Sequence, residues 1–215
     1  WELIGIKRID NKQNLFFYFL KGFLYSLTFI IIILIPIFLN YSGNWIGIIS
    51  IQIFLNSIFL IIGIGFAEEM IFRGWLLEEL KNQFGLKRAF IFQALIFSLA
   101  HIRFNRSFVE MACILMGLFL LGILLAFIKL KDKNSLWGCI GLHGGLVGIW
   151  FLLNNGLIEI AEDTPVWLVG PGIINRNPLG GTFGIIMLFF LCFFYFLKLK
   201  NLIKNKSKYS RDLKA

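Results

Sequence analysis

The chain has 215 residues, of which 58% are hydrophobic and 15% are charged, and its formal net charge is +9. Its mean hydropathy of +0.80 lies far above that of a water-soluble globular domain and excludes that class. Because backbone N–H and C=O groups in lipid must pair within the chain, the composition predicts an all-α, polytopic bundle of transmembrane helices.

Uncharged apolar runs of a length suited to membrane-crossing helices recur along the chain. In chain order they are Gly22–Leu39, Trp45–Ala67, a shorter run at Ala89–Ile102, Met111–Ile128, Ser135–Leu153 and Gly181–Leu197. We predict six spans, or seven if the stretch Met70–Leu80 crosses separately. They form a single membrane-embedded domain over residues 1–215.

The 21 Lys and Arg are divided unevenly between the two faces that these spans define. Most of them flank the spans on the face that carries both termini, whereas the opposite face has only Arg103, Arg106 and Arg176. The positive-inside rule therefore predicts cytoplasmic termini. The basic tail, residues 198–215, acts as an orientation signal that also meets anionic membrane lipid, so no nucleic-acid partner is expected.

In the segment Gly63–Leu80, GIGFAEEMIFRGWLLEEL, the charges of Glu68, Glu69 and Arg73 directly follow the second apolar run. Burying Glu68, Glu69 and Arg73 in hydrocarbon would cost about 8–10 kcal/mol, so such charges persist only if they are paired, hydrated or needed. Glu69 and Arg73 are spaced i, i+4, which favours an ion pair on a helix and leaves Glu68 without a local partner. Alternatively, the stretch is the cytoplasmic end of the span, with its charges among lipid headgroups.

The two histidines, His101 in FSLAHI and His143 in GLHGG, both fall in apolar runs. On straight helices with a rise of 1.5 Å per residue, Glu68, His101 and His143 each lie about 15–20 Å from the same face. A single buried His is more often a satisfied core residue. Because both histidines lie at the depth of the Glu68–Glu69 pair, the sequence nevertheless predicts one shared polar site.

A carboxylate and two imidazoles can activate water and stabilise an oxyanion, which is hydrolytic chemistry. The same groups, Glu68, His101 and His143, could instead complete a zinc site with an open water position. The residues alone leave open whether a divalent metal or no cofactor is used. No G-x-S-x-G or H-E-x-x-H motif occurs, so a covalent nucleophile is not indicated. A further alternative has the two histidines as axial ligands of a haem or chlorophyll.

Glycines surround the second histidine, and a long connection follows it. Gly141 with Gly145, and Gly144 with Gly148, are small-xxx-small pairs that allow close helix packing. A helix face thinned in this way could also admit a substrate backbone beside the histidine. The connection over residues 154–180 contains three of the four prolines, and it is expected to be an ordered or re-entrant loop on the outer face.

Three motifs in order carry a resemblance to a known family: E-E-x-x-x-R at 68–73, F-x-x-x-H at 97–101, and a later intramembrane His143. They resemble the motifs of the CPBP family of membrane-embedded endopeptidases, which comprises CAAX proteases and bacteriocin-processing enzymes of the Rce1-like or Abi group. The resemblance covers about residues 63–148. It implies an intramembrane endopeptidase that hydrolyses a peptide bond near the cytoplasmic side, in a membrane-associated or lipidated protein.

Carried over to this sequence, the resemblance implies a role for each motif residue. Glu68 would be the catalytic base that activates water, with Glu69 beside it and Arg73 as the pairing charge. His101 would act with Glu68 on the water, and Phe97 would pack one turn below the histidine. Family members are described both as metalloproteases and as glutamate-dependent enzymes, so the resemblance leaves the metal question open.

The last motif departs from the family pattern. His143 would stabilise the oxyanion, supported by Gly144, or serve as a metal ligand. Members often have Asn or Asp four residues later, where this chain has Val147. The alternative is a non-catalytic membrane scaffold or partner-binding protein derived from such proteases. The loop motifs TPVWLVGPG and NPLGG are similar to those of cyanobacterial and plastid members, so the expected location is a bacterial plasma membrane or a thylakoid-type membrane.

Overall fold

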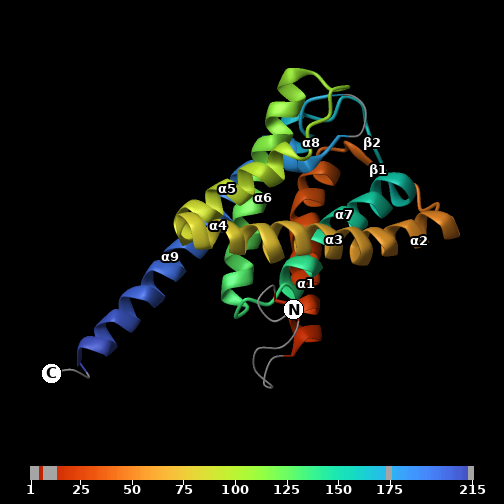
Figure 1. The fold of residues 1–215 in the computed structure, drawn as a ribbon. Coiled ribbons are helices and arrows are strands. Elements are labelled where there is room, and N and C mark those ends of the chain that lie inside the picture. The colour runs from red at the N-terminus through yellow and green to blue at the C-terminus, as the bar shows by residue number, and fades with distance from the viewer. Residues whose placement is uncertain (1–4, 7–13, 173–175, 213–215) are drawn as a thin grey trace.

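The computed structural model describes residues 5–6, 14–172 and 176–212, with side chains up to residue 198. These residues form an all-α fold with one small two-stranded sheet, which confirms the predicted fold class (Figure 1). Short π-helical or 3₁₀ segments are labelled η. In chain order the elements are α1 (Leu15–Leu39), β1 (Gly43–Trp45), α2 (Ile51–Phe59), η1 (Leu60–Ile64), α3 (Gly65–Glu69), η2 (Met70–Leu76), α4 (Leu77–Phe84), α5 (Leu86–Leu99), α6 (Phe108–Lys131), α7 (Trp137–Leu152), η3 (Leu153–Leu157), β2 (Ile158–Ile160), α8 (Val166–Val169), η4 (Pro178–Gly180) and α9 (Thr182–Asp212).

Within the described residues, four helices are long and apolar enough to cross a membrane, and a shorter apolar helix follows. The four are Leu15–Leu39, Ile51–Phe84, Phe108–Lys131 and Trp137–Leu157, and the shorter one is Thr182–Lys198. The structure therefore supports an integral membrane protein, while the predicted count of six spans stays a prediction. The stretch Met70–Leu80 lies inside the 34-residue helix and forms no separate one.

The 34-residue helix runs through α2, η1, α3, η2 and α4 and crosses α1 steeply (Figure 1). Ser50 begins it, because its hydroxyl accepts a hydrogen bond from the N–H of Ile53. The π-helical segments η1 and η2 flank α3, which carries Glu68 and Glu69. Such single π-turns inside an α-helix are frequent at functional sites.

The prediction that the whole run Trp45–Ala67 is helical is wrong for residues 45–50. β1 pairs antiparallel with β2, with Gly43 opposite Ile160 and Trp45 opposite Ile158. Gly47 has φ +69°, a left-handed conformation that interrupts a right-handed helix. The described part of the connection 154–180 contains β2, α8 and η4, so it is ordered as expected.

α7 packs against α1 on one side and against the 34-residue helix on the other, and its glycines permit both contacts. A Cβ at Gly141 would lie 2.1 Å from the carbonyl oxygen of Phe19 in α1. A Cβ at Gly144 would lie 1.9 Å from the carbonyl oxygen of Ile61 in η1. The two small-xxx-small pairs therefore serve helix packing, and Gly144 has no space beside it for a substrate backbone.

We expect Gly144→Ala to destabilise the protein by about 1–3 kcal/mol, because the added methyl group collides with backbone that cannot rotate away. The measurement is the thermal midpoint of the detergent-solubilised protein. Gly63→Ala is the matched control, since a Cβ there meets only the flexible Phe59 ring, at 3.1 Å. Equal losses for the two variants would contradict this account of Gly144.

Candidate active site

A cavity of about 550 Å³ lies between α1, the 34-residue helix, α6 and α7. Apolar side chains such as Ile33, Leu118 and Leu146 form much of its wall. Glu68 and both histidines also line it. The cavity therefore brings the predicted polar groups to one space that an amphipathic molecule can enter.

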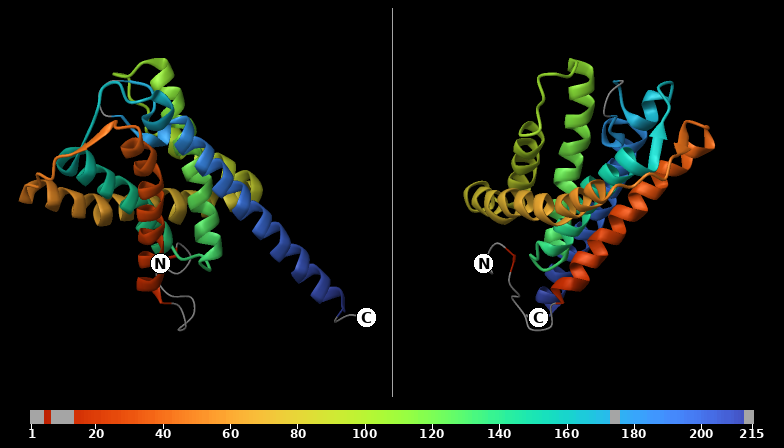
Figure 2. Two further views of the ribbon diagram at one scale, coloured as in Figure 1. Left: turned by 180° about the vertical axis from the view of Figure 1, so that it is seen from behind. Right: turned by 90° about the vertical axis from the view of Figure 1, so that its right-hand side faces the viewer.

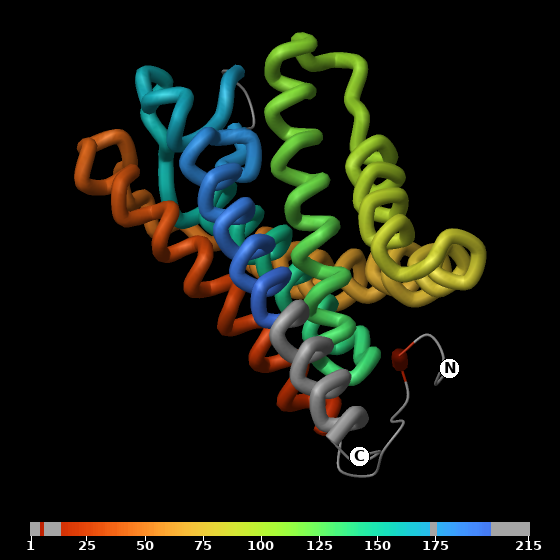
Figure 3. Tube along the Cα trace, turned by 90° about the vertical axis from the view of Figure 1, so that its left-hand side faces the viewer, coloured from red at the N-terminus to blue at the C-terminus, as the bar shows by residue number. Residues whose placement is uncertain are grey.

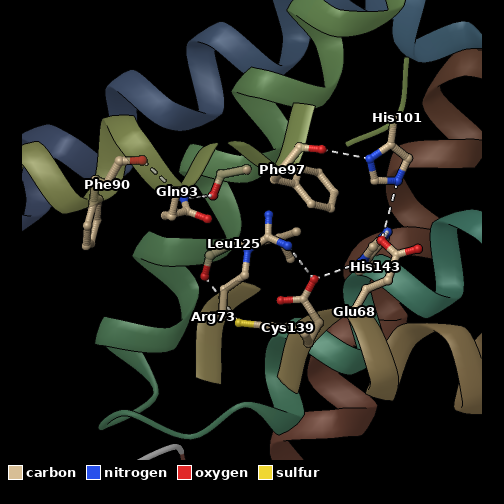
Figure 4. A network of polar contacts seen from close by, with 11 residues as sticks. Glu68, Arg73, Phe90, Gln93, Phe97, His101, Leu125, Cys139 and His143 are labelled. Atoms are coloured by element: carbon tan, nitrogen blue, oxygen red, sulfur yellow. Dashed lines mark hydrogen bonds and ion pairs between the residues drawn. The ribbon is translucent and has the colours of Figure 1, made fainter. Parts of the chain in front are cut away.

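Glu68 contacts both imidazoles (Figure 4). Its Oε2 atom lies 3.4 Å from Nε2 of His101 and 3.8 Å from Nε2 of His143. The three groups come from α3, from the turn after α5 and from the middle of α7. The predicted convergence on one site is confirmed as geometry, and their catalytic roles stay predictions.

The prediction that His101 lies within a helical span is wrong, because α5 ends at Leu99. The N–H of His101 bonds to the carbonyl of Ser98, three residues back, which closes a final turn. The Nδ1 atom is 2.7 Å from the carbonyl oxygen of Phe97. Since a carbonyl only accepts, Nδ1 carries a proton and Nε2 faces Glu68. The Glu68 carboxylate raises the pKa of His101 above its ordinary value, although burial opposes this.

Phe97 packs against the histidine as predicted. The ring centroids of Phe97 and His101 are 4.7 Å apart, and those of Phe97 and His143 are 5.5 Å apart, both in edge-on geometry. The Arg73 guanidinium carbon lies 4.0 Å from the centroid of the same Phe97 ring. This fully buried ring therefore packs against the buried cation and both imidazoles.

The predicted ion pair between Glu69 and Arg73 is present and fully buried, with Oε1 of Glu69 2.8 Å from Nη1 of Arg73. The same oxygen lies 2.7 Å from Nδ1 of His143. Because Glu69 accepts from this nitrogen, it fixes the imidazole with Nε2 toward Glu68. Glu68 and Glu69, which are neighbours on α3, therefore contact opposite edges of the His143 ring.

Lys129 is a neighbour of the site that sequence reasoning missed. It is 1% exposed, and its Nζ donates to the carbonyl oxygen of Arg73 at 2.8 Å and to Glu78 at 2.7 Å. At the end of η2 the N–H of Leu77 donates to the carbonyl oxygen of Phe72, five residues back, and not to that of Arg73, four residues back. The Arg73 carbonyl oxygen is therefore available to accept from Lys129. In the sequence Lys129 looked like one of several orientation signals at a helix end, which gave no sign of burial.

Val147 lines the cavity, so the position where family members often have Asn or Asp is apolar here. Asn154 and Asn155 of η3 line the same cavity and bring amide groups to it. The amide groups of these two residues therefore come from η3, whereas position 147 belongs to α7.

Glu68, His101 and His143 were also predicted as possible ligands of a zinc ion. Within the described part of the chain, no three His, Cys, Asp or Glu side chains are arranged to share one metal ion. As they lie, these donors do not form a ligand set.

A family model described as Rce1-like, type II CAAX prenyl endopeptidase, matches residues 50–149. The matched region contains Glu68, Glu69, Arg73 and both histidines. No curated protein and no solved structure matches the chain.

Proposed function

We propose that this chain, whose residues 50–149 match the Rce1-like type II CAAX prenyl endopeptidase family model, is an intramembrane endopeptidase. It hydrolyses a peptide bond in a membrane-associated or lipidated protein through water activated by Glu68 and His101. The family itself implies a protease. The observation that carries the finer proposal is the contact of Oε2 of Glu68 with both imidazoles on the cavity wall.

The proposed reaction begins when Glu68 accepts a proton from a water molecule held between its carboxylate and Nε2 of His101. The water oxygen attacks the peptide carbonyl carbon, and the carbonyl oxygen becomes an oxyanion. His143, held by Glu69 with its Nε2 edge toward the cavity, stabilises that oxygen. Glu68 then passes its proton to the leaving amine as the carbon–nitrogen bond breaks.

We expect His101→Ala to reduce hydrolysis by about 100-fold or more, because the water loses one of its two orienting groups. The protein is reconstituted in lipid vesicles and offered a library of membrane-anchored peptides, and products are identified by mass spectrometry. Gln83→Ala, an exposed position at the end of α4, is the control and should leave hydrolysis unchanged. Unchanged cleavage by His101→Ala would remove this histidine from the mechanism.

A non-catalytic scaffold is the second candidate, and the apolar Val147 in the cavity wall favours it. A scaffold needs the fold and its surface but no proton acceptor in the cavity. A strain that lacks the protein should then be rescued as well by a Glu68→Gln variant as by the natural sequence. An endopeptidase predicts that this variant fails to rescue although it accumulates normally.

A further inference from the structure

The cavity reaches one particular end of the bundle. Its lining includes side chains from the α5–α6 connection, from η3 and from the connection before η4, namely Arg103, Arg106, Asn154, Asn155, Arg176 and Asn177. The same end carries the small sheet of β1 and β2 and the helix α8 (Figure 2). Access to Glu68 and the histidines therefore lies at this end.

The beginning of the chain lies at the opposite end. Lys21, near the start of α1, forms an ion pair with Asp132 at the end of α6. The N–H of Leu136 donates to the carbonyl of Gly5, and the indole N–H of Trp137 donates to that of Ile6. The start of α1 and the α6–α7 connection thus form one end, opposite the α5–α6 connection (Figure 2).

Two further contacts bring α9 and α4 to this second end. The ammonium group of Lys131, the last residue of α6, lies 5.0 Å from the centroid of the Tyr195 ring. α9 runs along α6 (Figure 3). Lys129 contacts Glu78, which places α4 beside the last turn of α6.

The charged residues are distributed unevenly between these two ends of the bundle. The cavity end has three Arg, and it also has the acidic residues Glu110, Glu159, Glu162 and Asp163. At the second end, Lys21, Lys131 and Lys133 flank α1 and α6, and in the sequence the N-terminal arm and the tail after Tyr195 carry most of the remaining Lys and Arg. The positive-inside rule counts Lys and Arg near the ends of spans, so it assigns the second end to the cytoplasm.

We propose that the active-site cavity opens on the side of the membrane away from the cytoplasm, so that its substrates are protein segments exposed on that side. The assignment of a substrate rests on the proposed endopeptidase function, whereas the sidedness of the cavity does not. The proposed sidedness reverses the expectation from the sequence that hydrolysis takes place near the cytoplasmic side. The resemblance of the three motifs gave that expectation, but access to the site depends on the end of the bundle at which the cavity opens.

Single cysteines test the proposal without altering the charge of either end. Asn105→Cys and Asn155→Cys place exposed thiols at the cavity end, and Asn82→Cys places one at the end of α4. The background carries Cys113→Ser, since Cys139 and Cys192 are buried. Intact cells that express each variant are treated with a membrane-impermeant maleimide, before and after permeabilisation.

We expect Asn105→Cys and Asn155→Cys to be labelled in intact cells, and Asn82→Cys to be labelled only after permeabilisation. The reverse pattern, equal labelling of both ends, or labelling of the cavity end only after permeabilisation would overturn the proposal. Adding Glu68→Gln should leave the pattern unchanged, because labelling needs no hydrolysis. A labelling pattern that contradicts the proposed sidedness would therefore not affect the endopeptidase proposal. A lack of hydrolysis would likewise not affect the proposed sidedness.

Discussion

Glu68→Gln is expected to reduce peptide hydrolysis by about 100- to 10,000-fold, the range that a positioned general base contributes. Glutamine has nearly the same shape as glutamate but cannot take a proton from water. Glu68 belongs to no buried ion pair with Arg73 or Lys129, and its side chain is 27% exposed, so the fold should tolerate the change. Hydrolysis is measured with the reconstituted protein and a cleaved peptide from the membrane library.

Glu79→Gln is the matched control for this variant, because Glu79 is an exposed carboxylate on the same 34-residue helix. It should retain full hydrolysis and the same thermal midpoint. If Glu68→Gln still cleaved at the normal rate, Glu68 would not be the base. If both variants lost hydrolysis equally, the loss would reflect the charge of the helix rather than the site.

Glu69→Gln is expected to cost about 3–5 kcal/mol of stability, because it leaves the Arg73 guanidinium buried without its counter-ion. Both side chains of this pair are 0% exposed. The loss should appear as a lower thermal midpoint in detergent and as a smaller amount of protein in the membrane. Glu79→Gln again serves as the control, since an exposed substitution typically changes stability by no more than about 0.5 kcal/mol.

The double variant Glu69→Gln with Arg73→Met separates stability from chemistry. Replacing both members of a buried ion pair removes the uncompensated charge, so much of the lost stability should return. Hydrolysis should stay low, because Nδ1 of His143 no longer donates to a carboxylate that holds the ring. Recovery of both properties would show that Glu69 matters only as the partner of Arg73.

The contacts of Lys129 show where local patterns stop being informative. The i, i+4 spacing predicted the pair of Glu69 and Arg73, since both partners lie on one helix and the spacing fixes their geometry. No spacing links Lys129 to Arg73, because these residues are 56 positions apart and meet only when α6 packs against η2.

By itself the sequence determined the membrane setting, the helical class and the set of polar residues that share a site. Hydropathy and local spacing are properties of residues close together in the sequence, so they can be determined without knowing how the helices pack. The tertiary structure alone decided that residues 45–50 leave the helix, that His101 lies beyond the end of α5, and that the cavity reaches the end opposite the start of α1. Those features depend on how closely backbones approach at glycines such as Gly144, and on the steep crossing of the 34-residue helix.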